Sequence, residues 1–104
     1  MARLVRMGDI KDQIPVGGAK MVEVEGKQIA IFNVAGTYHA IDELCTHRAG
    51  PLSEGEIREN VVTCPWHRAQ FDVTTGKCLK GPAAKDVACY PIKVEGNTLL
   101  IEMP

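Results

Sequence analysis

With 104 residues, of which 45% are hydrophobic and 24% charged, the chain has room for one ordinary globular domain and excludes a second, catalytic domain. Its net charge of −1, without any block of like charges, excludes the basic footprint of a protein that binds nucleic acid or anionic membranes. The first fifteen residues contain acids and no long apolar run, so we expect neither a signal peptide nor a membrane anchor and predict a cytoplasmic monomer.

Short runs rich in valine and isoleucine are separated by glycines in the N-terminal part of the chain, and this pattern predicts an all-β fold. Strands are expected at residues 21–25, 28–34 and 37–41, with turns at Gly26 and Gly36. Before them, residues 8–15 are the place where a helical turn is expected, because Asp9 could cap its start and Pro15 would end it.

The middle of the chain, residues 43–83, has a different composition. It contains three prolines, several glycines and three of the four cysteines. We predict that it forms a loop-rich subdomain inserted into a single domain of residues 1–104, with residues 1–42 and 84–104 as the basal β-sheets.

Within this insert, strands are expected at residues 53–58 and 61–63. After the insert, the turn residues around Gly96 predict a hairpin between residues 92–94 and 98–102. The whole chain is therefore expected to be an antiparallel sheet sandwich carrying an inserted subdomain.

The insert contains two cysteine and histidine pairs, C-x-H at Cys45 and His47 and C-x-x-H at Cys64 and His67. One of the two strands expected in the insert leads away from the first pair, and the next leads back to the second pair. Both pairs would therefore lie at the same end of this hairpin. In a reducing compartment, cysteines are candidate metal ligands before they are candidates for a disulfide. Two thiolates and two imidazoles suit a structural zinc ion or a mixed [2Fe–2S] cluster.

The distribution of the ligands favours the cluster. Zinc modules usually take both sulfurs from one short loop, whereas here each pair supplies one cysteine and one histidine. A mixed cluster has two histidines on one of its two irons, so two loops that each span both irons need one ligand of each kind. An extended C-x-H segment points both ligands to one side, and Pro65 would bend the second segment so that its ligands converge. Zinc in the same site remains the alternative.

Several short motifs surround these ligands, and together they cover nearly the whole chain. They are "CTH", "PLSEG" (51–55), "CPWH", "FDVTTGK" (71–77), Gly81-Pro82 and the terminal "YPIKVEG". With them the chain resembles the Rieske-type ferredoxins. The resemblance implies that Cys45 and Cys64 hold an inner iron and that His47 and His67 hold an outer, more exposed one. It also implies that residues 81–83 form the proline loop that covers the cluster.

The residues beside the ligands predict a reduction potential near the low end of the Rieske range of roughly −150 to +300 mV. High-potential relatives carry a disulfide at the positions of Gly50 and Trp66, so that bridge cannot form here. They also donate hydroxyl hydrogen bonds from the positions of Ala69 and Phe71. Without those donors, negative charge on the cluster sulfurs is less stabilised in the reduced state.

Other residues near the ligands are considered for roles besides cluster binding. Arg48 and Arg68 each follow a ligand histidine and could bias partner choice or simply be solvated. Apolar residues that would ring the cluster, shielding it and forming a small docking patch, are Pro51, Leu52, Pro65 and Trp66. We place His39 outside the site and interpret Cys78 and Cys89 as small hydrophobic residues of strands, for which a disulfide stays a minor alternative.

The resemblance implies a one-electron carrier, not an enzyme, which passes electrons from an NAD(P)H-dependent flavin reductase to a terminal oxygenase through transient protein contacts. No set of nucleophile and base stands apart from the ligands, in agreement with that role. One alternative is the small subunit of a nitrite reductase, which shares the fold. The other is an interaction module stabilised by zinc.

Overall fold

The computed structural model describes residues 3–46, 50–66, 68–81 and 85–103. These residues form strands and two single-turn 3-10 helices, which confirms the predicted all-β class. The strands are β1 (Arg3–Arg6), β2 (Ala19–Val24), β3 (Lys27–Val34), β4 (Thr37–Asp42), β5 (Glu56–Arg58), β6 (Val61–Thr63), β7 (Gln70–Asp72), β8 (Cys78–Lys80), β9 (Cys89–Tyr90), β10 (Ile92–Glu95) and β11 (Thr98–Met103). The 3-10 helices are η1 (Lys11–Gln13) and η2 (Leu52–Glu54). In the described part of the chain, no helix is long and apolar enough to cross a membrane.

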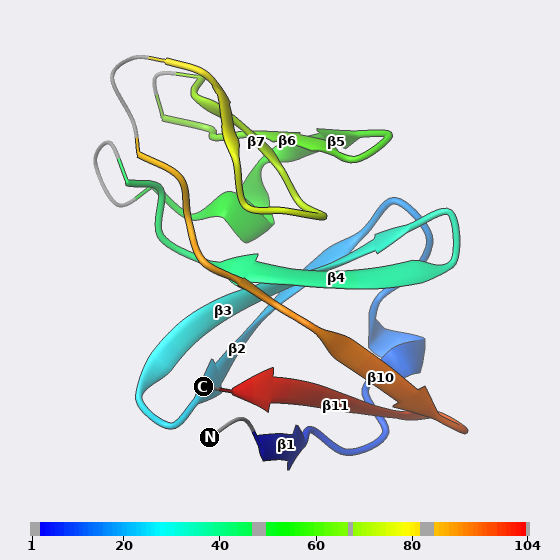
Figure 1. The fold of residues 1–104 in the computed structure, drawn as a ribbon. Coiled ribbons are helices and arrows are strands. Elements are labelled where there is room, and N and C mark those ends of the chain that lie inside the picture. The colour runs from blue at the N-terminus through cyan, green and yellow to red at the C-terminus, as the bar shows by residue number, and fades with distance from the viewer. Residues whose placement is uncertain (1–2, 47–49, 67, 82–84, 104) are drawn as a thin grey trace.

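The strands form three antiparallel sheets that lie one above another (Figure 1). The upper sheet has the order β5-β6-β7-β8 and lies within the segment predicted as an insert. The central sheet has the order β2-β3-β4-β9, and the lower sheet the order β1-β11-β10. The first and last strands pair with each other, so both ends of the chain belong to the lower sheet, on the far side of the central sheet from the insert.

The central strand β3 is buried on both faces, which explains its almost unbroken apolar sequence. Ile29 and Ile31 belong to the core between the central and lower sheets, whereas Ala30 and Phe32 belong to the core below the insert. Side chains alternate along a strand, so one strand supplies two cores. Each fully buried isoleucine or phenylalanine contributes about 1.5–3 kcal/mol to folding.

The predicted turns between β2, β3 and β4 are confirmed. Glu25 and Gly26 join the first two strands with φ of 53° and 82°, and Ala35 and Gly36 join the next two with 53° and 91°. Positive φ at both central residues is what a two-residue type I′ hairpin requires, and glycine adopts it without strain. The glycines therefore set the register of the central sheet.

The helical turn expected at residues 8–15 forms as η1, but Asp9 is not its cap. The residue that precedes η1 is Ile10, and no side chain caps the helix. Asp9 instead accepts a hydrogen bond of 2.6 Å from the hydroxyl of Thr98, at the start of β11. The prediction failed because a partner 89 residues away in the sequence competes for that carboxylate.

The strand predicted at residues 53–58 is shorter than expected. Only Glu56–Arg58 is extended, and the residues before it form η2. The N–H of Ser53 donates to the carboxylate of Glu43, and the hydroxyl of Ser53 donates to its second oxygen, at 2.8 and 2.7 Å. These bonds hold the turn against the end of β4. The motif "PLSEG" therefore forms a turn, and the strand begins only after it.

Candidate metal centre

Two loops of equal length present the cysteines that were predicted as ligands. The first loop, residues 45–50, is closed by the bridge between Leu44 and Pro51, and the second, residues 64–69, by the pairing of β6 with β7. The N–H of Cys45 donates to the carbonyl of Gly50 at 2.9 Å, and the N–H of Cys64 donates to that of Ala69 at 2.7 Å. Each cysteine is therefore the first residue of a six-residue hairpin loop.

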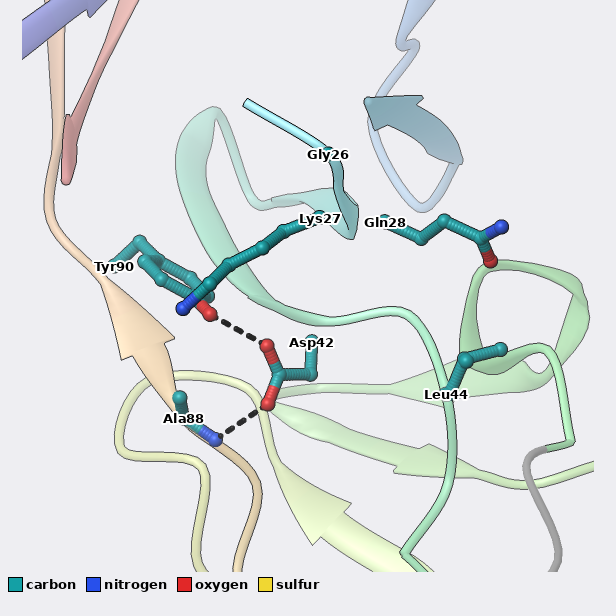
Figure 2. Close-up of a pocket in the computed structure, with 7 residues that line it drawn as sticks. All are labelled: Gly26, Lys27, Gln28, Asp42, Leu44, Ala88 and Tyr90. Carbon is teal, nitrogen blue, oxygen red and sulfur yellow. Dashed lines mark hydrogen bonds between the residues drawn. The ribbon is translucent and has the colours of Figure 1, made fainter. Parts of the chain in front are cut away.

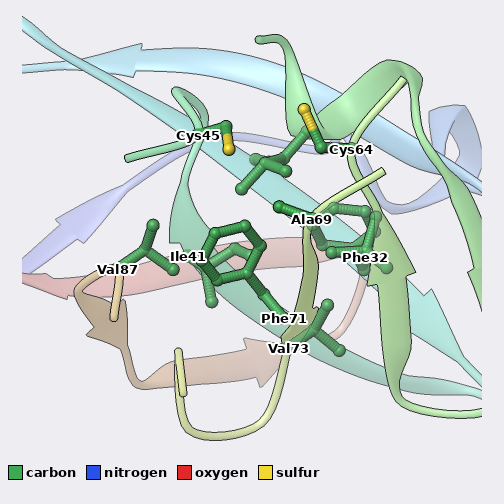
Figure 3. Close-up of a cluster of buried hydrophobic side chains, with 11 residues drawn as sticks. Phe32, Ile41, Cys45, Cys64, Ala69, Phe71, Val73 and Val87 are labelled. Carbon is green, nitrogen blue, oxygen red and sulfur yellow. The ribbon is translucent and has the colours of Figure 1, made fainter. Parts of the chain in front are cut away.

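The two cysteines meet at one end of the core below the insert (Figure 3). Cys45 is 3% and Cys64 1% exposed, and the two thiols lie close enough for Cys45 to raise the pKa of Cys64. Burial raises the pKa of the Cys64 thiol and the Cys45 thiol raises it further, whereas a hydrogen bond from the Trp66 N–H lowers it. Two buried sulfurs that face each other are thus poorly solvated as thiolates, and a bound cation would stabilise both.

The first loop packs directly on the second. A Cβ atom added to Gly50 would lie 2.6 Å from Cys64 Sγ and 3.3 Å from Trp66 Cβ. Gly50 has no positive φ, so its glycine is required by space and not by backbone conformation. Gly50 and Trp66, the positions at which high-potential relatives carry a disulfide, are therefore neighbours here. Trp66 packs on the backbone of Gly50.

The base of the first loop is held by a buried acid, Glu43, that was not among the predicted site residues. Glu43 is 4% exposed, and its carboxylate accepts both hydrogen bonds from Ser53. The carbonyl of Glu43 also accepts a hydrogen bond of 2.7 Å from the N–H of Leu52. A glutamate two residues before the cysteine and a serine in "PLSEG" were the only signals in the sequence, because their pairing depends on the fold.

A second carboxylate fixes β9 beside the first loop. Asp42 accepts hydrogen bonds from the Tyr90 hydroxyl at 2.6 Å and from the Ala88 N–H at 3.1 Å, in an open groove of about 500 Å³ (Figure 2). Burial raises the pKa of Tyr90, and the hydrogen bond to Asp42 raises it further. The tyrosine therefore stays neutral and donates its hydrogen bond to Asp42. This bond joins β9 to the end of β4, the strand that leads to Cys45.

The segment after β8 also reaches the first loop. The hydroxyl of Thr46 donates a hydrogen bond of 2.5 Å to the carbonyl of Lys85. Gly81 is exposed, whereas Pro82 and Ala83 of the predicted proline loop lie outside the described residues. The bond between Thr46 and Lys85 brings the end of that segment to the ligand loop.

The two positions predicted to lack hydroxyl donors are fully buried. Ala69 closes the second loop, and Phe71 follows it in β7 within the same core as the cysteines (Figure 3). Neither side chain can donate a hydrogen bond. The backbone N–H of Trp66 donates a hydrogen bond to the Cys64 sulfur.

Of the four predicted ligands, the structure brings Cys45 and Cys64 together, while His47 and His67 lie outside the described residues, as does Arg48. Arg68 is exposed and has a φ of 62°. Glycine would adopt this positive φ without strain, whereas arginine does not favour it.

The predicted ring of apolar residues is only partly correct. Leu52 is completely buried in the core below the cysteines and cannot belong to a docking patch. It is buried because η2 turns its side chain inward while Ser53 is held by Glu43. Trp66 is 51% exposed, Pro65 is exposed and Pro51 is half-buried, so these three remain available at the surface.

The other two cysteines and His39 lie apart from the loops. Cys78 is half-buried and packs against the upper core, as expected of a small hydrophobic residue. Cys89 lies in a strand as predicted, and it is exposed because β9 is the edge strand of the central sheet. Both thiols are free, and His39 is half-buried in β4.

The described residues fit a [2Fe–2S] cluster held in part by cysteine. They supply two buried sulfurs from two matched loops, a backbone donor to one sulfur, and a glycine that leaves room beside it. No group of three side chains among the histidines, cysteines and acids within the described ranges could hold a metal elsewhere. The cysteine pair is therefore the centre of the candidate site.

Known proteins support this assignment. The family model of the Rieske [2Fe-2S] domain matches residues 7–91. The ferredoxin component of the naphthalene 1,2-dioxygenase/salicylate 5-hydroxylase systems of Ralstonia sp is 42% identical over 92 residues, which are 88% of this chain and 88% of that protein. These matches confirm the predicted cofactor and the predicted electron-carrier role.

Solved structures agree. The ferredoxin of carbazole 1,9a-dioxygenase from Nocardioides aromaticivorans IC177 has a TM-score of 0.83 at 28% identity and covers 88% of this chain and 89% of its own. A ferredoxin solved in complex with the oxygenase of carbazole 1,9a-dioxygenase has a TM-score of 0.81 at 25% identity, over 88% of this chain and 85% of that one. A protein assigned as an NADH-dependent nitrite reductase small subunit from Mycobacterium tuberculosis, at 21% identity and a TM-score of 0.85, shows the fold alone. By its sequence, its fold and its paired cysteine loops, the chain belongs to the Rieske [2Fe–2S] family.

Proposed function

We propose that this protein accepts one electron at a time from an NAD(P)H-dependent flavin reductase and delivers it to a terminal oxygenase. The observation that carries the proposal is the buried pair of Cys45 and Cys64, presented by two matched loops on a chain that is 42% identical to a dioxygenase ferredoxin component. A relative of the same fold binds an oxygenase. The proposal includes a cytoplasmic, monomeric carrier.

We further propose that Cys45, His47, Cys64 and His67 hold the cluster. A bound [2Fe–2S] cluster would take up and release one electron at a potential near the low end of roughly −150 to +300 mV. The chain's own residues bury the two sulfurs, donate the Trp66 N–H to one of them, and fix the loops through Gly50. The absence of hydroxyl donors at Ala69 and Phe71 supports the low potential.

The alternatives drawn from the sequence have less support. A zinc module does not agree with the match to a [2Fe-2S] family over residues 7–91. A nitrite reductase subunit of known structure shares the fold at 21% identity, whereas the ferredoxin of carbazole 1,9a-dioxygenase, also of known structure, is 28% identical. The oxygenase system is therefore the better supported partner.

The test is a reconstituted reaction with purified holoprotein, the flavin reductase and the terminal oxygenase encoded nearest to this chain. We expect NADH or NADPH oxidation coupled to product formation only when all three proteins are present. The reduced carrier should show a rhombic EPR spectrum of Rieske type, and a Cys64→Ser variant should lose both the spectrum and turnover. Colourless protein that contains zinc, or turnover that proceeds without the carrier, would contradict the proposal.

A further inference from the structure

The segments around the ligand loops are basic although the chain as a whole is not. Residues 45–50, 64–69 and 80–85 contain four Arg or Lys residues and no acid. The whole chain has 12 basic and 13 acidic residues, so the remainder has eight bases against thirteen acids and a net charge of −5. The three ligand segments therefore have a net positive charge, and the remainder of the chain has a net negative charge.

The fold brings these three segments together. Gly50 of the first loop lies against Trp66 and the sulfur of Cys64 in the second. Thr46 donates its hydrogen bond to the carbonyl of Lys85, and Lys80 is paired in register with Gln70, directly after the second loop. We call the exposed cations Arg68, Lys80 and Lys85 the basic tip. Arg48 belongs to the same segments in sequence and lies outside the described residues.

The cations of the basic tip have no anionic partner among the described residues, whereas several other arginines do. Arg3 pairs with Glu25 and Arg6 with Glu95, and Arg58 pairs with Glu56 of its own strand β5. Glu56 lines a small pocket with Arg68 and Cys64, but its ion pair is with Arg58 at 3.4 Å. Asp86, next to Lys85, accepts a hydrogen bond from the Cys78 N–H and forms no ion pair with Lys85 among the described residues. The basic tip therefore keeps its charge exposed.

Arg68 is held in a conformation that its residue type does not favour. Its φ of 62° costs an L-residue about 1–2 kcal/mol relative to the right-handed region. The other non-glycine residues with positive φ in the described structure are Glu25, Ala35 and Glu59, and each lies in a two-residue hairpin turn. An exposed arginine that is strained and unpaired beside a redox centre points to a use for its side chain outside the chain itself.

We propose that the basic tip, which includes Arg68, is the docking surface for an acidic face of the terminal oxygenase. The inference rests on the proposed electron-carrier function and adds the charge of the partner surface. Opposite charges steer two proteins into contact and raise the association rate by about 10- to 1000-fold at low salt. The uneven charge also orients the carrier. The acidic face of the oxygenase attracts the basic tip and repels the rest of the chain, which has a net negative charge. Trp66 and Pro65, both exposed beside Arg68, supply the small apolar contact of a transient interface.

The first test measures the charge at the electron-exchange edge without any protein partner. Reduced holoprotein is mixed in a stopped-flow instrument with ferricyanide or with hexaammineruthenium(III), and one electron passes from the protein to one oxidant ion. We expect the rate with anionic ferricyanide to fall as salt is added, although the net charge of the chain is −1. The rate with the cationic oxidant should rise or stay level. A ferricyanide rate that rises with salt, as the net charge alone predicts, would overturn the inference.

Matched variants assign the effect to Arg68. Arg68→Glu should remove most of the salt dependence with ferricyanide, and Arg68→Lys, which keeps the charge, should retain it. Lys93→Glu changes the charge of the chain by the same amount but lies in β10 of the lower sheet, so it serves as the control. Equal effects of Arg68→Glu and Lys93→Glu would overturn the role of Arg68. A protein that binds no cluster reacts with neither oxidant, which contradicts the proposed function and this inference with it.

The second test uses the terminal oxygenase encoded nearest to this chain, at a fixed concentration of substrate and with excess reductase. We expect Arg68→Glu to raise the KM for the carrier about three- to tenfold at low salt, with kcat little changed, since steering acts on association. Arg68→Lys and Lys93→Glu should stay near the original KM. If the oxygenase turns over with the same KM for all variants, the docking surface is elsewhere while the electron-carrier function stands.

Discussion

The backbone of Gly50 lies against the sulfur of Cys64, so that an added Cβ would come within 2.6 Å of Sγ. In the free protein the thiol could rotate away, but a sulfur bound to iron could not. We therefore expect Gly50→Ala to weaken cluster binding by about 1–3 kcal/mol, the usual cost of overpacking. Faster loss of the visible absorbance on dilution into a chelator would measure it.

The matched control for that variant is Gly96→Ala, which has open space around it but a φ of 62°. It should lower the melting temperature through backbone strain and leave the rate of cluster loss unchanged. If both variants lose the cluster at the same rate, the contact between Gly50 and Cys64 is not what limits cluster binding.

The cysteines should divide into two classes. Cys45→Ala and Cys64→Ala are each expected to abolish the cluster, because each removes a buried sulfur from the pair. Cys78→Ala and Cys89→Ala should retain full iron content, since both lie outside the ligand loops. Iron and acid-labile sulfide analysis of the four variants checks the assignment, and a cluster that survives loss of Cys64 would refute it.

The reduction potential should respond to one added hydroxyl. Ala69→Ser introduces a small donor at a fully buried position that closes the second ligand loop. A hydrogen bond to a charged group is worth about 1.5–3 kcal/mol, which corresponds to a rise of roughly 60–130 mV for one electron. Potentiometric titration followed by EPR measures the shift. Ala69→Gly, which also alters packing but adds no donor, is the control and should not raise the potential.

Arg68 should lower the stability of the protein, because its backbone conformation does not favour arginine. Arg68→Gly relieves the strain of positive φ, partly offset by the greater freedom of glycine in the unfolded chain, for a net gain of about 0.5–1 kcal/mol. The melting temperature should rise by roughly 2–5 °C. Arg68→Ala removes the same side chain but keeps the strain, so its melting temperature should not rise. Identical thermal curves for the two variants would argue that the loop is not strained.

Tyr90 should make stability depend on alkaline pH. Its pKa is raised by burial and by Asp42, so the folded state holds the phenolic proton more tightly than the unfolded state. Stability from this group is therefore fully present below the unfolded value of about 10 and is lost as pH rises through the folded pKa. Circular dichroism melts between pH 7 and pH 11 follow this loss.

Tyr90→Phe should cost about 1.5–3 kcal/mol at neutral pH, because it removes a donor to the Asp42 carboxylate, and should flatten the alkaline decline. Tyr38→Phe is the control, since the Tyr38 hydroxyl has only a 3.5 Å contact with the carbonyl of Lys11. A larger loss in the Tyr38 variant would show that packing, and not the bond to Asp42, holds β9.

The sequence by itself determined the cofactor and the class of fold. Alternating strands and the glycine turns at residues 26 and 36 are local features, so they could be identified before the structure was known. The pairing of one cysteine with one histidine in each loop is also local, and ligand chemistry gives it meaning without coordinates. The unequal spacing of the two motifs was puzzling in sequence. The structure places their cysteines at the same point of two equal loops.

Only the tertiary structure decided which neighbours matter. Leu52 was assigned to a surface patch although it is buried, because burial depends on which sheet covers a residue and not on its own sequence. The bond between Glu43 and Ser53 and the contact between Gly50 and Cys64 likewise join positions whose nearness only folding creates. The basic tip is a property of the same kind. Its charges are scattered in the sequence, and they act together because three loops meet at the cysteines.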